Sequence, residues 1–396
     1  MSKKSRVALV RCDDYEPQKL YSRLSLAIEL LGGLHSFVSE GESIVLKPNV
    51  LVGTSPEKPV GTHPAVLETM VQILKKNISN CRLSYGDSSA LGSPEENMRK
   101  AVYYERMQAL GVSLANFVDA SEMRLEESPF IKSFEIARGV TEADGLISIA
   151  KMKTHGFMKV TGAVKNSFGC IPGFRKPQFH VRLESPFEFA KMLVSLNLVL
   201  KPRLYVLDGI ISMEGNGPMN GTPVNTRALM VSQDPVALDS VMCAVMNLDP
   251  ALVPTNVWGQ KLGLGQMDLN KIEILGDKLE DFVMPSFNVS RERFYINRAA
   301  GLFPFVRKAL IPRPVIDEAN CTQCGRCVEI CPVSPKALSF SRGKKNPPVY
   351  DYKNCISCFC CQEICPHRAI LVKQPWISRL FYLISKKDPG FREHPL

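Results

Sequence analysis

Long hydrophobic runs are absent from this 396-residue sequence. No stretch of about 18 uncharged apolar residues exists, so we expect no transmembrane helix. The N-terminal segment MSKKSRVALVRC has only a short apolar run before charge resumes, which is too little for the hydrophobic region of a secretory signal. We therefore expect a cytoplasmic protein.

Several fingerprints of nucleotide and acyl chemistry are also missing. The glycine pattern GxGxxG does not follow the first expected strand, and neither a Walker loop nor a GxSxG motif is present. No basic run is interleaved with aromatic residues, so we expect no nucleic-acid partner. The 49 Lys and Arg against 39 Asp and Glu instead favour an acidic partner protein or an anionic small-molecule substrate.

Cysteine, by contrast, is abundant and concentrated near the C-terminus. Nine of the 13 cysteines lie in residues 321–365, within the runs CTQCGRCVEICP and CISCFCCQEICP. Because the chain is large and the crowding is local, metal binding is a better interpretation than a disulfide scaffold. The four scattered cysteines are interpreted as small, buried apolar side chains.

The spacing of the cysteines indicates which metal they hold. A zinc ribbon uses four ligands, commonly as two CxxC pairs, whereas both runs here share the frame C-x2-C-x2-C-x3-C-P. In bacterial ferredoxins, three cysteines of such a run hold one [4Fe–4S] cubane and the fourth ligates the other cluster. The ligands expected for the first cluster are Cys321, Cys324, Cys327 and Cys365. Those expected for the second are Cys355, Cys358, Cys361 and Cys331.

Cys360 is a ninth cysteine within these runs. It could replace Cys361 as a ligand, but only Cys361 keeps the intervals of the first run. We therefore interpret Cys360 as a spare thiol packed beside the cluster.

Strand and helix patterns alternate from residue 1 to about residue 277, which predicts an α/β domain whose mostly parallel sheet is flanked by helices. A small α+β ferredoxin-like domain is expected at residues 317–373. Residues 278–316 are interpreted as a linker or docking segment, and residues 374–396 as a C-terminal tail. Both segments are basic and aromatic, so weak contact with a membrane surface is an alternative to docking.

Polar residues follow five of the expected strands. In an open parallel sheet the ligand crevice lies outside the carboxyl ends of the strands, so these residues are expected to face one place. They are Lys47 and Asn49, Asp87, the group Lys151, Lys153 and His155, then Asp208, and Asp234. Asp234 has an alternative role as the cap of the following helix.

Three long segments, residues 47–64, 151–180 and 208–224, are expected to form functional loops at this crevice. A histidine among so many lysines should stay neutral and could serve as a base. The alternative is a solvated loop. The expected catalytic residues are His155, Lys153, Asp87 and Asp208. The residues expected to bind an anionic group or cofactor are Lys47, Asn49, Lys151, Lys165 and Asn166.

The segments VLKPNVL, GTHPAVLETMV, YGDSS, KMKTHGFMKVTGAVKNSFG, DGIISMEGNGP and DPVALDSV occur in this order before the cysteine runs. Together they resemble the widespread prokaryotic domain-of-unknown-function family often labelled iron–sulfur centre protein. The resemblance spans nearly the whole chain and implies no defined activity. A more distant likeness in fold, to the N-terminal domain of lactate-racemase-like proteins, implies a nickel cofactor, although no motif residue can be matched.

These observations lead to one main hypothesis and two alternatives. The main hypothesis is an oxidoreductase whose two [4Fe–4S] clusters relay electrons from a redox partner protein to a substrate or an unidentified second cofactor in the α/β domain. One alternative is a ferredoxin-like carrier whose large domain only recognises a partner. The other is an isomerase or metal-cofactor protein in which the clusters are structural or sensory.

Overall fold

The computed structural model describes residues 4–89, 91–128, 130–173, 175–292 and 311–373. The chain divides into two compact units, Met1–Val289 and Ser290–Leu396. The first unit continues beyond residue 277, because Phe282, Phe287 and Val289 pack into its core. Much of the expected linker, and the whole expected tail, lie outside the described residues.

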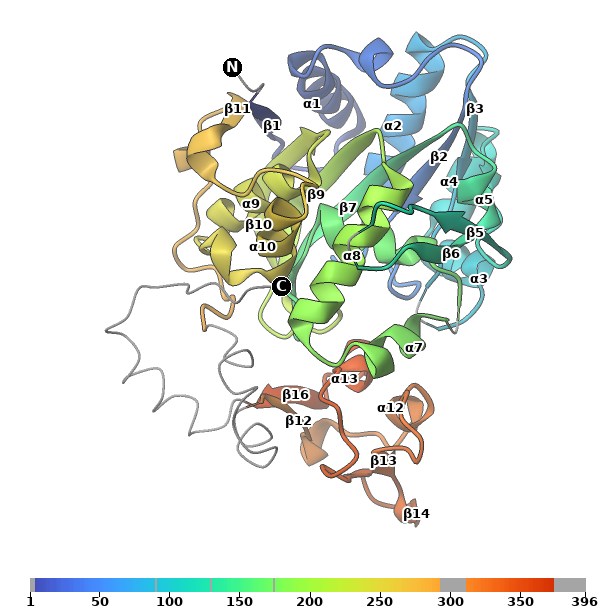
Figure 1. Ribbon diagram of the computed structural model, residues 1–396, viewed down its shortest axis with the longest axis vertical. Helices are drawn as coiled ribbons and strands as arrows, with labels where there is room; N and C mark the ends of the chain where they lie inside the picture. Colours follow the sequence, from blue (N-terminus) through green and yellow to red (C-terminus); the bar gives the residue numbers. More distant parts are fainter. Residues whose placement is uncertain (1–3, 90, 129, 174, 293–310, 374–396) are drawn as a thin grey trace. The chain divides into compact units, whose positions relative to one another are not determined.

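The first unit alternates strands and helices along most of its length (Figure 1). Its strands are β1 (Ser5–Arg11), β2 (Ser43–Pro48), β3 (Arg82–Tyr85), β4 (Ser113–Leu114), β5 (Ala120–Arg124), β6 (Ser133–Ala137), β7 (Gly145–His155), β8 (Lys159–Thr161), β9 (Leu204–Glu214), β10 (Thr222–Ser232) and β11 (Ile272–Gly276). Its helices are α1 (Pro17–Leu30), α2 (Pro64–Asn77), α3 (Pro94–Lys100), α4 (Tyr103–Ala109), α5 (Arg138–Thr141), α6 (Ala163–Asn166), α7 (Arg175–Arg182), α8 (Pro186–Leu200), α9 (Pro235–Val245) and α10 (Pro254–Lys261).

Many of these helices begin where the sequence places a proline. Proline opens α1, α2, α3, α8, α9 and α10, and its fixed φ and missing N–H suit the first helical turn. A side chain at the preceding position often accepts from the first N–H groups, as Ser93 does for α3 and Asp234 for α9. Local sequence therefore fixes most helix starts.

The main sheet has nine strands in the order β11-β1-β10-β9-β7-β2-β3-β4, with β8 paired to β7. Along this order, β10 is antiparallel to both of its neighbours, whereas all the other pairings are parallel. This confirms the predicted α/β class with a mostly parallel sheet. It also means that β10 ends at the opposite edge from β2, β3, β7 and β9.

Helices cover both faces of the sheet, and β7 shows why. Ile147 and Ile149 belong to the core cluster that contains the buried residues of α1 and α2, whereas Ala150 and Met152 belong to the cluster that contains those of α9. Successive side chains of a strand point to opposite faces, so a strand covered on both sides is apolar throughout. Figure 1 shows α1 and α2 behind the sheet and α8 to α10 in front of it.

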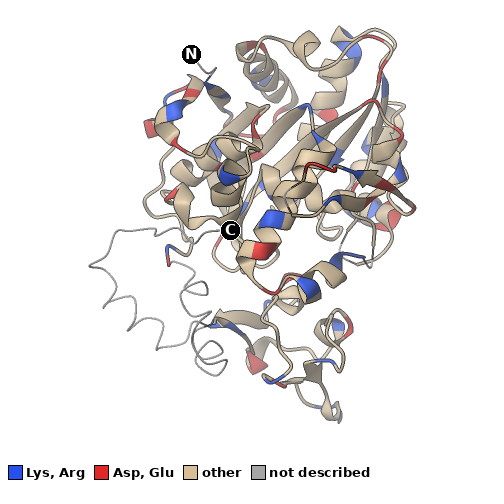
Figure 2. Cartoon of the chain, in the orientation of Figure 1, with Lys and Arg blue, Asp and Glu red and all other residues tan. Residues whose placement is uncertain are grey.

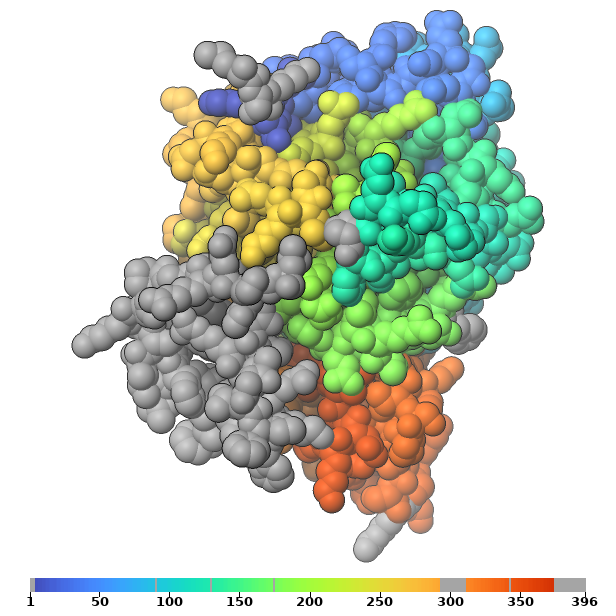
Figure 3. Space-filling view, viewed as in Figure 1, coloured from blue at the N-terminus to red at the C-terminus, as the bar shows by residue number. Residues whose placement is uncertain are grey.

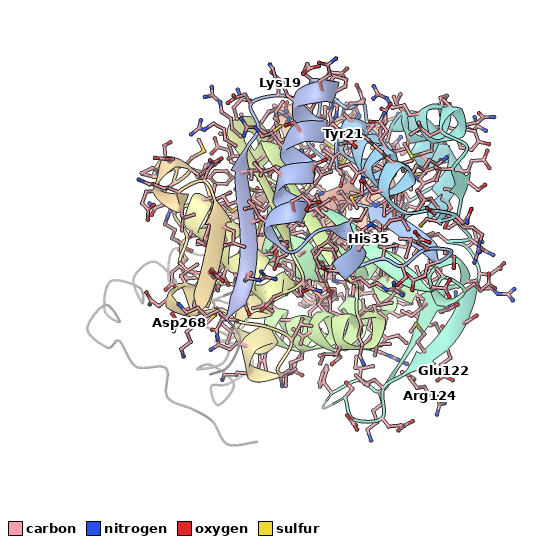
Figure 4. The ribbon with its side chains drawn as sticks, turned by 90° about the horizontal axis from the view of Figure 1, so that it is seen from above. Lys19, Tyr21, His35, Glu122, Arg124 and Asp268 are labelled. Carbon is pink, nitrogen blue, oxygen red and sulfur yellow. The ribbon has the colours of Figure 1, made fainter. Side chains whose placement is uncertain are left out.

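A separate antiparallel hairpin, β5–β6, lies outside the main sheet. It forms part of the surface of the α/β unit, shown in teal in the space-filling view (Figure 3). Glu122 and Arg124 lie at its outer side, where they form an exposed ion pair at 3.0 Å (Figure 4).

In the described part of the chain, no helix has the length and apolarity that crossing a membrane would require.

The second unit is small and mixes short strands with short helices. Its elements are β12 (Arg313–Ile316), α12 (Arg326–Glu329), β13 (Leu338–Ser339), β14 (Ser341–Lys344), β15 (Val349–Tyr350), α13 (Cys360–Ile364) and β16 (Ile370–Lys373). Strand β12 pairs with β16, and β13 pairs with β15, both antiparallel. The core contains Leu338, Ala369 and Ile370 together with cysteines, so the thiols themselves supply much of its interior.

Candidate functional site

Two recesses in the second unit are lined by cysteines. The first, of about 360 Å³ and partly open to solvent, is bordered by Cys321, Cys324, Cys327 and Cys365. The second, of about 310 Å³, is bordered by Cys331, Cys355, Cys358 and Cys361. Each recess thus combines three cysteines of one run with one cysteine of the other, which is the crossed grouping expected for two cubanes.

The backbone around the two recesses repeats the same unusual conformation. Gln323 and Gly325 have φ values of 53° and 82°, and the equivalent Ser357 and Phe359 have 55° and 62°. Left-handed residues alternating with right-handed ones turn successive N–H groups toward one side, and such nests bind anions, including iron–sulfur clusters. Non-glycine residues adopt this conformation at a cost, so its recurrence in both runs points to a shared ligand rather than to local preference.

The donor set suits a cluster better than a single ion. All 13 cysteines lie in the described residues and each is a free thiol. Among the described residues, no three His, Cys, Asp or Glu side chains gather as the ligands of one metal ion would. A zinc ion needs sulfurs about 2.3 Å from one point, whereas a cubane separates its four ligands around a larger body.

Cys360 does not border the second recess, although Cys358 and Cys361 on either side of it do. It is buried at the start of α13. This position agrees with a spare thiol packed beside the cluster. Tyr350 does border the recess, and its hydroxyl lies 3.3 Å from the Cys361 sulfur.

In the α/β unit, Lys151 and Asp208 form a buried ion pair with Nζ 2.8 Å from Oδ2. Tyr15 joins them, because its hydroxyl donates to Asp208 at 2.9 Å and accepts from Lys151 at 3.0 Å. The backbone N–H of His63 donates to the same carboxylate at 2.9 Å, and the His63 ring stacks on Tyr15 with the ring centroids 3.7 Å apart. Asp208 is therefore surrounded by donors from three other segments of the chain.

Burial shapes the electrostatics of this cluster. It raises the pKa of the Tyr15 hydroxyl, and the charge of Asp208 adds to the rise. Burial also lowers the pKa of Lys151, with Asp208 opposing the fall. Burial lowers the pKa of His63 to about 4, so this imidazole is neutral at pH 7. Tyr15 and His63 are only partly buried, which leaves them as the members that can meet a ligand.

A second buried ion pair lies on the other face of the sheet edge. Lys47 Nζ is 2.9 Å from Asp87 Oδ1 and also donates to Asn166 at 3.0 Å. Gly169 makes the approach possible, because a Cβ there would stand 1.8 Å from Asp87 Oδ1. The other Asp87 oxygen accepts from the Val50 N–H at 2.6 Å, so the carboxylate also fixes the chain after β2.

Asn49 connects the two faces. Its side chain accepts from Lys153 at 2.8 Å and donates to Asn166 at 3.2 Å. Lys153 also donates to the Val60 carbonyl. The sequence-predicted residues Lys47, Asn49, Asp87, Lys153 and Asn166 therefore form one network at the carboxyl edge of the sheet, with their polar groups bonded to one another.

His155 and Lys165 are two further site residues predicted from the sequence. His155 is the buried last residue of β7, and its Nδ1 accepts from the N–H groups of Phe157 and Met158 at 3.0 and 3.2 Å. Lys165 is partly buried in α6. His155 lies two residues after Lys153 on β7, and Lys165 directly precedes Asn166 in α6.

Two expectations about this edge are wrong. Lys151, Lys153 and His155 belong to strand β7, not to a glycine-rich loop, since the strand runs to His155 and turns back into β8. Asp234 does not share the edge, because β10 is antiparallel to its neighbours. Asp234 instead caps α9 and accepts from Ser5 at the start of β1 at 2.6 Å.

Three buried or half-buried residues were not predicted from the sequence. No motif in the sequence pointed to Tyr15, and the only indication of His63 was its place in the segment GTHP before α2. Asp239 on α9 accepts from the Ala163 and Val164 N–H groups at 2.6 and 3.1 Å, and burial raises its pKa to about 7. Each of the three acts on a segment remote in sequence, which a local pattern does not reveal.

Comparison with known families agrees with both units. Residues 44–244 match the family described as Domain of unknown function (DUF362), which is half of the chain. The chain belongs to this family. Residues 313–366 match the 4Fe-4S dicluster domain, so this family member is an iron–sulfur protein with a ferredoxin-type domain.

Individual relatives add little about activity. A thylakoid-associated protein of Synechocystis sp. is 34% identical over 259 residues, which cover 65% of this chain and 79% of the relative. Lactate racemase apoprotein from Thermoanaerobacterium thermosaccharolyticum is similar at 13% identity and a TM-score of 0.42, over 62% of this chain and 57% of that one. A Thermotoga maritima protein gives 10% identity and a TM-score of 0.35, over 57% of each chain. The two structural likenesses are too low to support an argument about activity.

Proposed function

We propose that this protein transfers single electrons through two [4Fe–4S] clusters, one held in each cysteine-lined recess, to a substrate or second cofactor at the sheet edge of the α/β unit. The observation that carries the proposal is the crossed grouping of the cysteines. A cubane supplies a reversible one-electron couple. The sequence spacing and the folded geometry give the same grouping.

The chain's own residues have defined roles in this proposal. Four cysteines bind each cluster as thiolates, and the left-handed residues of each run aim N–H groups at the sulfurs. Beside the Cys361 thiolate, the Tyr350 hydroxyl serves as a hydrogen-bond donor. These donors stabilise negative charge, which is what a cluster gains on reduction.

At the sheet edge, the ion pairs Lys151–Asp208 and Lys47–Asp87 act as positioning groups, because both are buried and each carboxylate has its counter-charge within 2.9 Å. Tyr15 and His63, which they hold in place, are the groups that can contact an electron acceptor. His63 Nδ1 accepts from the Ala65 N–H, so the neutral imidazole carries its proton on Nε2 and can donate a hydrogen bond to an acceptor that gains charge.

A second candidate function has its own supporting observation. The predicted lysines Lys47, Lys151 and Lys153 already bond to groups of the chain, which is what a domain without a small-molecule site would also show. In that case the protein is an electron carrier whose α/β unit recognises a partner. Substituting His63 by Gln separates the two, because a carrier keeps its rate of electron transfer and an enzyme loses turnover.

The cluster assignment is tested by anaerobic purification with iron and sulfide quantitation, and by EPR before and after dithionite reduction. We expect about eight irons and two interacting cubane signals. Cys358→Ser should remove or destabilise one cluster, whereas Cys360→Ser, on a neighbouring thiol that does not border the recess, should keep both. Equal iron loss in the two variants, or four irons in the reconstituted wild type, would refute the assignment.

A further inference from the structure

The two cysteine-lined recesses have different surroundings. Besides its cysteines, the first is bordered by polar residues that include Gln323, Arg326 and His367. The second is bordered mainly by apolar residues, which include Val333, Leu338 and Phe359 from the second unit. Clusters held in these recesses would therefore have different neighbouring side chains, some of them polar or charged at the first recess and mainly apolar at the second.

Exposure of the thiols follows the same division. Cys324 of the first recess is exposed, although Cys365 of the same recess is 8% exposed, and in the second recess Cys358 and Cys361 are each 8% exposed. Electron transfer to an outside partner is favoured where the distance between redox centres is short. The first recess therefore offers the shorter path to a protein that docks from solvent.

Several basic side chains lie at or near the first recess. Arg326 borders it, and Lys344 Nζ lies 3.7 Å from where a side chain at Gly325 would begin. His367 and Arg368, both exposed, follow the last cysteine of the recess. The acidic residues nearby are Asp317, which caps the turn before Cys321, and the exposed Glu318 and Glu329. Basic residues are spread over the loops of this unit (Figure 2).

We propose that the first recess is the port for electron exchange, and that a small acidic redox protein docks on it through Arg326, Lys344 and Arg368. This inference rests on the proposed function, because it requires a cluster in that recess. In the exchange, one electron leaves the reduced donor and enters the oxidised acceptor. No bond forms or breaks, and no proton needs to move.

The proposed docking at the first recess is tested in the holoprotein by reversing the charge of single basic residues beside it. The probe is a purified acidic [2Fe–2S] ferredoxin, and the measurements are its dissociation constant by calorimetry and the rate of electron exchange by stopped flow. Lys344→Glu and Arg368→Glu should weaken binding and slow exchange about tenfold at low salt, because opposite charges steer association. The effect should fall as ionic strength rises, since salt screens exposed charges.

The matched control is Lys353→Glu, which changes net charge equally but lies on an exposed turn before Cys355 of the second recess. It should alter binding and exchange much less than Lys344→Glu does. An equal or larger effect of Lys353→Glu, or binding that does not respond to salt, would refute docking of the acidic protein at the first recess.

Iron content and exchange with a neutral mediator, measured for every variant, distinguish this failure from failure of the proposed function. If clusters are absent from the wild type, the proposed function fails and the port fails with it. If both clusters are present and react with the neutral mediator, but the ferredoxin does not discriminate between the variants, only the port is wrong.

Discussion

Lys151 and Asp208 pair directly across the parallel strands β7 and β9, with Nζ 2.8 Å from Oδ2 and both side chains almost wholly buried. The two residues are 57 positions apart in sequence. Their charges offset each other's desolvation, and Tyr15 and His63 complete the hydrogen bonds of the carboxylate. This pair fixes the geometry of the partly exposed Tyr15 and His63 in front of it.

Removing one partner of this pair should strongly destabilise the α/β unit. Lys151→Met leaves the Asp208 carboxylate buried without a counter-charge, which should cost about 3–5 kcal/mol of unfolding free energy in urea. The double variant Lys151→Met/Asp208→Leu should recover much of the loss. As a control, Lys100→Met removes an exposed pair with Glu96 and should cost less than about 1 kcal/mol. A Lys151→Met cost as small as the control would show that the pair is not needed.

Gly169 should not tolerate a side chain. In Gly169→Ala the added Cβ would lie 1.8 Å from Asp87 Oδ1 and 2.7 Å from Lys47 Nζ, so the ion pair must move apart. We expect a loss of roughly 2–4 kcal/mol in unfolding free energy. Gly41→Ala is the comparison, because nothing lies within 4 Å of that position and only its φ of 75° opposes alanine, at about 1–2 kcal/mol. Similar losses in both variants would exclude a special role for the close contact.

Tyr350→Phe should lower the reduction potential of one cluster. Removing the hydroxyl takes a hydrogen-bond donor from a position 3.3 Å from the Cys361 sulfur, and that donor favours the more negative, reduced form. If the hydroxyl stabilises the reduced cluster over the oxidised one by roughly 0.5–1.5 kcal/mol, its removal lowers the one-electron reduction potential by about 20–60 mV. An EPR-monitored redox titration should show one shifted wave and one unchanged wave. Tyr352→Phe, whose hydroxyl donates to the Pro314 carbonyl, is the control.

Asp239 should make stability fall as pH rises. Its pKa is raised from 3.8 to about 7 in the folded protein, so between these values the native state holds a proton that the unfolded chain releases. Native stability therefore decreases from about pH 4 to pH 7, by about 4 kcal/mol for three pKa units, and this contribution is constant above pH 7. In Asp239→Asn the decrease should disappear, as measured by urea unfolding from pH 5 to pH 8. An unchanged pH dependence would show that Asp239 is ionised in the native state.

The titration of His63 changes stability with pH in the opposite direction, so the contribution of Asp239 must be found by comparing variants. Its pKa is lowered from 6.5 to about 4, so the unfolded chain takes up a proton first as the pH falls. That contribution is present above pH 6.5 and is lost on acidification toward pH 4. The unfolding free energy of the wild type therefore depends on pH through two opposed contributions. Only the difference between the wild type and Asp239→Asn gives the contribution of the Asp239 carboxyl group.

Much of the architecture could be read from local patterns. The alternation of strands and helices indicated the α/β class, and the alternative role given to Asp234, as the cap of the following helix, is confirmed by the structure. The ends of β7 and β9 were missed because polar residues such as Lys153 and Asp208 interrupt the apolar pattern while remaining in the strands. In a sheet covered on both faces, a buried ion pair can continue a strand where a pattern of apolar residues would end it.

The direction of β10 could not be derived from its sequence. A strand's apolar pattern is the same in either orientation, and the length of the connection decides between them. Because β9 extends to Glu214 and β10 starts at Thr222, only a short turn joins them, and a short turn permits only antiparallel pairing. This reversal is what removed Asp234 from the candidate site.

The sequence alone determined the grouping of the eight cysteines, because short intervals within each run and their repetition restrict which thiols can reach one recess. Tertiary structure alone decided the other site. Whether a lysine faces a ligand or a carboxylate depends on strands brought together from distant segments, as with Lys47 and Asp87 or Lys151 and Asp208. A buried charge must be compensated by whatever the fold places beside it, and sequence spacing does not specify that neighbour.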